Sequence, residues 1–256
     1  MARQPVFAGS FYPASKQLCE RMLESFKPKP EPEACAVVSP HAGWVYSGRT
    51  AMRAVERLKG KGTVVVVSPN HTGIGEAVSV SKQDWVTPLG EIKCDAEAAQ
   101  KIVDEGFAFD EAGHGQEHSI EVQLPFIQKL FPEARLVAVT MADQSLEIAG
   151  KLGEALAKLD VAVIASSDFT HYEPAKQAKQ KDDAVLAALE GLDVKEFYDA
   201  LKENECSACG YGPIAAAATF AKKRGAKKAR VIDYSNSGQR TRDESSVVDY
   251  YAIEFI

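Results

Sequence analysis

The chain has 256 residues, which is enough for one large α/β domain or two small ones. Its formal net charge of −6 argues against general nucleic-acid binding, because nucleic-acid-binding proteins carry basic faces, but an anionic small substrate held by a local Arg or Lys stays compatible with it. The five cysteines are an odd number without the spacing of a disulfide scaffold, and the N-terminal residues lack the apolar core of a secretion signal. No apolar stretch is long enough to span a membrane, so we expect a reduced, cytoplasmic protein that contacts neither membranes nor nucleic acids.

Hydrophobic periodicity predicts helices and strands that alternate along most of the chain. The predicted helices span residues 15–26, 47–58, 95–105, 118–130, 145–159, 176–189, 194–203 and 214–223. The predicted strands span residues 34–39, 64–67, 77–81 (an edge or hairpin strand), 135–141, 161–165, 230–234 and 247–255. Pro125 either kinks the helix at 118–130 or begins its second half. The pattern predicts an α/β fold with a mainly parallel or mixed central sheet flanked by helices, and no composition shift divides residues 1–256 into domains.

Three predicted strands share one design, in which a short apolar run is followed by serine and then by a histidine. The stretch TVVVVSPNHTG carries His71, ACAVVSPHAG carries His41, and VAVIASSDFTH carries Asp168 and His171. Ligands of open α/β sheets bind outside the carboxyl ends of the strands. We therefore expect these side chains to share one site.

The residue types at these strand ends are typical of a metal site. Neutral imidazole binds Fe, Cu, Zn and Ni, so His41 and His71 are candidate ligands. Cys209 is the best third ligand, because it precedes a predicted helix whose N-terminus would lower the thiol pKa and favour the thiolate. Cys206 and Cys209 form a CxxC pair, which also allows a redox disulfide. The structural alternatives are loop histidines that only cap or pack and a buried, inert cysteine.

Further polar residues are candidates for the chemistry of this site. Asp168 would orient an imidazole or cap a helix, and His171 would act as general acid or base near neutral pH. His118 would line the cleft, or its neighbour Glu121 would cap and pair locally. His114 lies in a polar, glycine-rich loop and receives no role. The chain lacks the GxGxxG, Walker A, HExxH and GxSxG motifs, which argues against nucleotide binding and ordinary hydrolase chemistry.

Six segments follow one another from near the N-terminus to beyond residue 210: AGSFYPA, SPHAGWVYSG, SPNHTG, EHSIEVQLPF, SSDFTHY and ACGYGPI. In these segments the chain resembles the Memo family, also called the AmmeMemoRadiSam system protein B family. That family is similar in fold to class III extradiol dioxygenases of the LigB type, which hold non-haem Fe(II) with two histidines and a carboxylate. The resemblance implies a single Memo-like domain with a LigB-like fold.

The resemblance also implies a role for each candidate residue. His41 and His71 correspond to the two metal histidines, and Cys209 falls where the dioxygenases have their carboxylate ligand. His171 corresponds to the dioxygenase acid/base histidine, and Asp168 and His118 match cleft residues of the family. A softer thiolate ligand shifts the metal preference toward copper or a redox-active iron centre, and it counts against ring cleavage.

The expected function is that of a metal-dependent oxidoreductase with Fe(II) or copper as cofactor. One alternative is a non-enzymatic module that binds a peptide or protein in the same cleft. Another is a metal-free thiol enzyme with Cys209 as nucleophile and His41 or His71 as base. The resemblance implies an AMMECR1-like protein and a radical SAM enzyme as partners, with a small molecule or peptide as ligand of the cleft.

Overall fold

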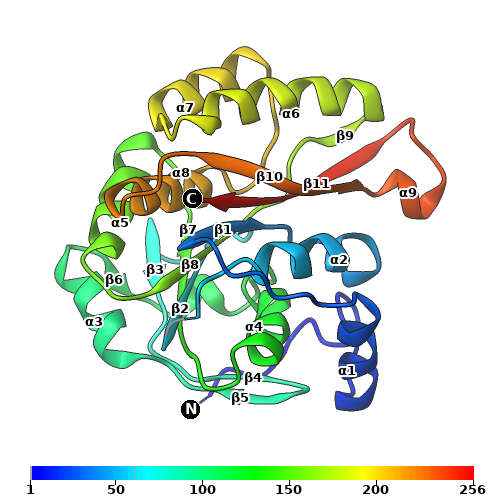
Figure 1. The fold of residues 1–256 in the computed structure, drawn as a ribbon. Coiled ribbons are helices and arrows are strands. Elements are labelled where there is room, and N and C mark those ends of the chain that lie inside the picture. Colours follow the sequence, from blue (N-terminus) through cyan, green and yellow to red (C-terminus); the bar gives the residue numbers. More distant parts are fainter. Residues whose placement is uncertain (1, 61) are drawn as a thin grey trace.

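Four parallel strands form the centre of the sheet in the computed structural model, which describes residues 2–60 and 62–256 (Figure 1). In spatial order they are β1 (Ala36–Ser39), β8 (Ala162–Ser166), β2 (Thr63–Pro69) and β7 (Arg135–Met141). Almost every residue of these strands is buried. Strands covered on both faces need apolar side chains on both, which is why the valine run of β2 has no alternation.

Antiparallel strands extend the sheet on both sides. Next to β1 lies β11, which also pairs with β10 and β9; next to β7 lies β3, which pairs in parallel with β6. Their bounds are β3 (Val78–Val80), β6 (Ala108–Phe109), β9 (His171–Glu173), β10 (Ala229–Asn236) and β11 (Val247–Phe255). A separate hairpin joins β4 (Trp85–Thr87) to β5 (Gly90–Ile92). The predicted mixed α/β sheet is thereby confirmed, whereas the likeness to LigB-type enzymes stays a prediction.

Helices cover both faces of the sheet (Figure 1). One face carries α1 (Lys16–Ser25), α2 (Trp44–Val55) and α4 (Leu124–Leu130), and the other carries α3 (Ala96–Asp104), α5 (Leu146–Ala157), α6 (Ala175–Glu190), α7 (Val194–Glu203) and α8 (Tyr211–Lys223). A short helix, α9 (Gly238–Thr241), lies between β10 and β11. Alternate β2 residues pack into different cores, Val64 and Val66 with the first group and Val65 and Val67 with the second. None of the helices in the described ranges has the length and apolarity needed to cross a bilayer.

The predicted helix at 118–130 is wrong in its first half. Residues 118–120 are irregular, a 3-10 helix, η2, spans Glu121–Gln123, and only then does α4 begin. Pro125 lies in the first turn of α4, where its missing N–H removes no intrahelical hydrogen bond, so the proline begins the helix and does not kink it. The apolar residues Ile120 and Leu124 have helical spacing, yet both are buried by tertiary packing.

Candidate functional site

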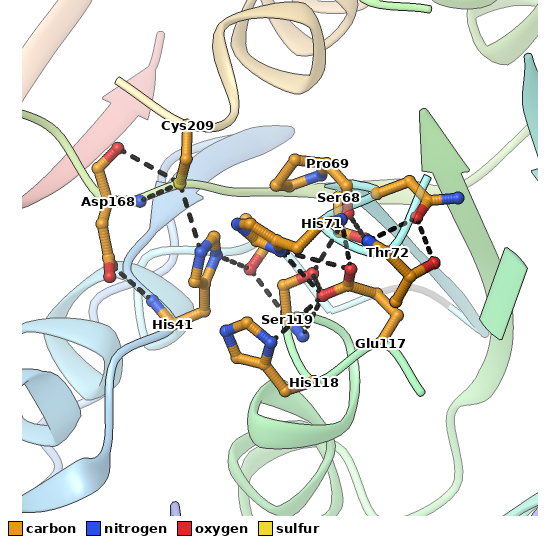
Figure 2. Close-up of polar contacts among 12 residues, drawn as sticks. His41, Ser68, Pro69, His71, Thr72, Glu117, His118, Ser119, Asp168 and Cys209 are labelled. Atoms are coloured by element: carbon orange, nitrogen blue, oxygen red, sulfur yellow. Dashed lines mark hydrogen bonds and ion pairs between the residues drawn. The ribbon is translucent and has the colours of Figure 1, made fainter. Parts of the chain in front are cut away.

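Three histidines that are distant in the sequence meet at one edge of the sheet (Figure 2). His41 follows β1 and His71 follows β2, while His118 comes from the irregular segment that precedes η2. One ring nitrogen from each of the three lies within 4.8 Å of those of the other two. They line a cleft of about 570 Å³, together with Asp168 and His171.

His41 is buried, and the hydrogen bonds around it fix its tautomer. Its Nδ1 lies 3.0 Å from Ser166 Oγ, which itself donates to the carbonyl of Ser119 at 2.7 Å. Since a carbonyl only accepts, the hydroxyl proton of Ser166 is used there, and Nδ1–H of His41 must donate to Ser166. Burial lowers the pKa of His41 well below its usual range, and the neighbouring His118 and His71 add to this. The ring is therefore neutral, with the lone pair on Nε2.

A single carboxylate holds the other two rings. Glu117 is fully buried, and its Oε1 lies 3.0 Å from Nδ1 of His71 and 3.3 Å from Nδ1 of His118. The backbone N–H of His71 and both the N–H and hydroxyl of Ser119 donate to the same carboxylate. Burial raises the pKa of Glu117, but these hydrogen bonds outweigh it and bring the pKa down to about 2. Because Nδ1 of His71 donates to this carboxylate, Nε2 of His71 is left free, which is the arrangement that second-shell carboxylates give to metal-binding histidines.

His118 is the third member of this cluster. Burial lowers its pKa to about 4, although the Glu117 carboxylate works in the opposite direction, so the ring is neutral at physiological pH. The ring centroids of His118 and Phe11 lie 4.6 Å apart, and those of His118 and His71 lie 4.9 Å apart. The sequence placed His118 only in the cleft; the structure places it as close to His41 and His71 as they are to each other, with centroid separations between 4.9 and 5.3 Å.

Cys209 lies beside the cluster on the side of His41. Its Sγ is 3.2 Å from Nε2 of His41, and it accepts the backbone N–H of Asp168 at 3.3 Å. Burial raises the pKa of the Cys209 thiol, and the Asp168 carboxyl adds to this effect. The prediction that a helix N-terminus favours the thiolate is therefore wrong for the metal-free chain. Desolvation of the charged sulfur raises the pKa more than the N-terminus of α8 lowers it. Cys206 contacts Asp182 at 3.3 Å, and all five cysteines are free thiols.

Asp168 and His171 lie at the same cleft but outside the three-histidine cluster. Asp168 Oδ1 accepts the backbone N–H of His41 at 2.8 Å, so it holds the strand end and not a ring. Burial raises the pKa of Asp168 to about 7, partly offset by this hydrogen bond. His171 donates Nδ1–H to the carbonyl of Ser207 at 3.2 Å, which leaves Nε2 as an acceptor in the cleft. Burial lowers the pKa of His171.

Several further residues build the site, although the sequence predicts no role for them or predicts a different role. Glu117 stands directly before His118, but its partner His71 is far away in the sequence, so only the fold reveals its role. Gln123 is buried and donates to the carbonyl of Pro40 at 2.9 Å and to Ser166 at 3.0 Å, which fixes the strand ends that carry His41 and Asp168. Glu121 does not cap or pair locally; it accepts hydrogen bonds from the N-terminal segment.

The fold and site define a class of α/β protein with a histidine-lined cleft at the carboxyl edge of its parallel strands. The family of Memo-like proteins matches residues 3–254, and the chain belongs to this family. Similar proteins are MEMO1 family proteins of Methanosarcina barkeri, 43% identical over 98% of each chain, and of Nitrosopumilus maritimus, 39% identical over 100% of each chain. Another, from Aquifex aeolicus, is 38% identical over 99% of each chain.

A solved structure supports the fold alone. It is described as an uncharacterized protein from Escherichia coli K12 and is similar with a TM-score of 0.53 at 14% identity. The similarity covers 85% of this chain and 98% of that one.

Proposed function

We propose that this chain binds a redox metal, iron(II) or copper, through His41, His71 and His118, and that it acts as an oxidoreductase on a small molecule in the cleft. The observation that carries the proposal is the cluster of three ring nitrogens within 4.8 Å, in which Nδ1 of His41 and Nδ1 of His71 each have a hydrogen-bond acceptor and Nδ1 of His118 lies 3.3 Å from the Glu117 carboxylate. Imidazoles held in this way suit iron, copper and zinc. Cys209, 3.2 Å from His41, would add a softer ligand and favour copper or redox-active iron.

In this proposal, different residues around the cluster fix the histidine tautomers and transfer the substrate proton. Ser166 fixes the tautomer of His41 and the Glu117 carboxylate fixes that of His71, so that the lone pair of both rings lies on Nε2. A bound metal would supply Lewis acidity and electron transfer to the cleft. His171, with Nε2 free and its pKa lowered by burial, would take up or release a substrate proton.

The test is metal content by mass spectrometry after oxygen-free purification and separate loading with Fe(II), Cu(I) and Zn(II). We expect near-stoichiometric iron or copper in the wild type and a large loss in His71→Ala and Cys209→Ser. The matched controls are His171→Gln, a cleft histidine outside the cluster, and Cys206→Ser, a neighbouring thiol that contacts Asp182 instead. Both should load like the wild type. A wild-type protein that takes up none of the three metals, or His71→Ala loading in full, would overturn the proposal.

One contact favours a second candidate function, a metal-free thiol enzyme. Cys209 and His41 form a cysteine–histidine pair at 3.2 Å, the pairing that activates a nucleophilic thiol. The raised pKa of the buried Cys209 works against it. Activity that persists in chelator-treated protein and is abolished by alkylation would support this candidate, and full activity of Cys209→Ala would exclude it.

Exposed aromatic side chains at the cleft favour the binding-module alternative. Tyr46 is 42% exposed and Tyr172 is 79% exposed, and both line the cleft that holds the histidines. The proposed partners are a peptide segment, an AMMECR1-like protein or a radical SAM enzyme in a reducing, cytoplasmic setting. Capture of such a partner by the metal-free His71→Ala variant would favour this alternative over the enzyme.

A further inference from the structure

The N-terminal segment, residues 3–12, is held by one buried carboxylate. Glu121 is fully buried, and its Oε2 accepts from Nη1 of Arg3 at 2.7 Å and from the backbone N–H of Val6 at 3.0 Å. Its Oε1 accepts from the backbone N–H of Phe7 at 2.8 Å and from the hydroxyl of Tyr12 at 2.9 Å. All four partners are donors, so the position requires a group that only accepts, which among neutral and charged side chains is the ionised carboxylate.

Arg3 connects this carboxylate to the segment that carries His118. Its Nε donates to the carbonyl of His114 at 3.0 Å and its Nη2 donates to the carbonyl of Glu117 at 3.1 Å. The guanidinium also lies 4.1 Å from the ring centroid of Trp85. One planar group thus fixes the chain at positions 114, 117 and 121, on both sides of His118, a task that needs its rigid fork of donors.

The aromatic residues of the N-terminal segment contact the site itself. Phe11 packs against His118 with ring centroids 4.6 Å apart, and Phe7 lies 5.6 Å from the same ring. The carbonyl of Phe11 accepts the backbone N–H of Trp44, the first residue of α2, at 2.8 Å. Phe11 also lines the cleft. The segment therefore forms a wall of the site between His118 and the start of α2.

We propose that Arg3 and Glu121 are positioning residues, which hold residues 3–12 against His118 and so determine where its ring lies in the cluster. Neither side chain reaches the ring nitrogens; both act through Phe11 and through the main chain around His118. The inference rests on the proposed function only where it concerns the metal that the His118 ring would bind. The position of the ring is a property of the metal-free protein and is measured there.

The test compares two buried carboxylates. Glu121→Gln places an amide NH₂, which cannot accept, against two of the four donors. Glu254→Gln is the matched control, because Glu254 is also fully buried and also accepts from arginine side chains, Arg57 at 2.8 Å and Arg230 at 2.6 Å, but lies on β11 away from the three histidines. Arg3→Lys is the second variant, since an ammonium group cannot reach three acceptors as a planar fork does.

The readouts are NMR of the metal-free proteins at fixed pH and hydrogen exchange. In Glu121→Gln and Arg3→Lys we expect loss of the NOE between the rings of Phe11 and His118, a shifted His118 ring signal, and exchange of the Val6 and Phe7 amides at least about tenfold faster than in the wild type. Glu254→Gln should keep the NOE and the ring shift, even though it loses stability. Where the wild type takes up metal, its affinity should fall about 10- to 100-fold in the two variants, as for loss of other orienting groups.

Two results would overturn the inference: an unchanged Phe11–His118 NOE in both Glu121→Gln and Arg3→Lys, or an equal loss in Glu254→Gln, which would indicate general loosening. If Glu121→Gln does not fold, Arg3→Lys is decisive. If the wild type binds no metal, the proposed function fails while the NOE comparison still decides the positioning role.

Discussion

His114 should make the folded protein sensitive to acid. It ends the 3-10 helix at Ala112–His114 and has no exposed surface. Its Nε2–H donates to the carbonyl of Ser79 at 3.1 Å, whereas Nδ1 has no hydrogen-bond partner within the described residues. Burial lowers the pKa of His114 from 6.5 to about 4, and the nearby Arg3 guanidinium adds to the effect. A second proton on this ring would therefore lie buried without an acceptor.

The sign and size of this pH effect on stability follow from the difference in the pKa of His114 between the folded and the unfolded protein. As the pH falls below 6.5, the unfolded chain protonates His114 and the folded chain does not until about pH 4, so the stability present above pH 6.5 is lost across this interval. At about 1.4 kcal/mol per pH unit, the full loss is roughly 3 kcal/mol, of which about 2 kcal/mol falls between pH 7 and pH 5.

The assay is urea unfolding of chelator-treated wild type and His114→Gln at pH 7 and pH 5. Glutamine retains an N–H donor for the carbonyl of Ser79 but takes up no proton. The comparison between the two proteins cancels the other titrating groups, including the histidines of the cleft. We expect the variant to lose about 2 kcal/mol less free energy of unfolding than the wild type over this range. If both proteins lose the same amount, the reasoning about the buried ring is wrong.

Three further predictions concern packing, a buried acid pair and the site. Gly153→Ala in α5 would place Cβ 2.5 Å from a backbone carbonyl of α8 and should cost about 1–3 kcal/mol in thermal unfolding. Gly150→Ala in the same helix faces open space and should stabilise by about 0.4–1 kcal/mol; similar effects of the two would contradict the packing. Burial and the neighbouring Asp182 carboxyl raise the pKa of Asp249, so this carboxyl costs stability as the pH rises above its ordinary range. Asp249→Asn should therefore stabilise by about 1–2 kcal/mol at pH 8 and by little at pH 4, and a gain that is equal at both would refute this. Glu117→Gln should weaken metal binding about 10- to 100-fold in a chelator competition, and unchanged affinity would show that the carboxylate does not orient the rings.

The sequence alone predicts the centre of this fold well, for a physical reason. The valine run of β2 and the apolar run of β8 are buried on both faces, so their composition reports their environment directly. Parallel strands end at the same edge, so the histidines that follow β1 and β2 had to converge. The local sequence is therefore enough to predict that His41 and His71 lie at the site.

The other parts of the site depend on contacts that local sequence does not contain. Glu117 orients a ring that lies in a different loop, and Glu121 is satisfied by donors at the far N-terminus. The pKa of Cys209 depends on how completely the folded chain excludes water from the sulfur, which no spacing rule supplies. His114 reads as part of a polar loop, but its ring is buried beside Trp85 with centroids 5.8 Å apart.

The place of β1 in the sheet has a consequence for how the chain is made. β1 is the first strand in chain order, yet its neighbours are β8 and β11, the latter ending at Phe255. A nascent chain emerging from the ribosome must therefore carry β1 with an open edge until β11 has been translated. Open, apolar strand edges pair readily with other chains, so a messenger that stops short of β11 would yield a product prone to aggregate.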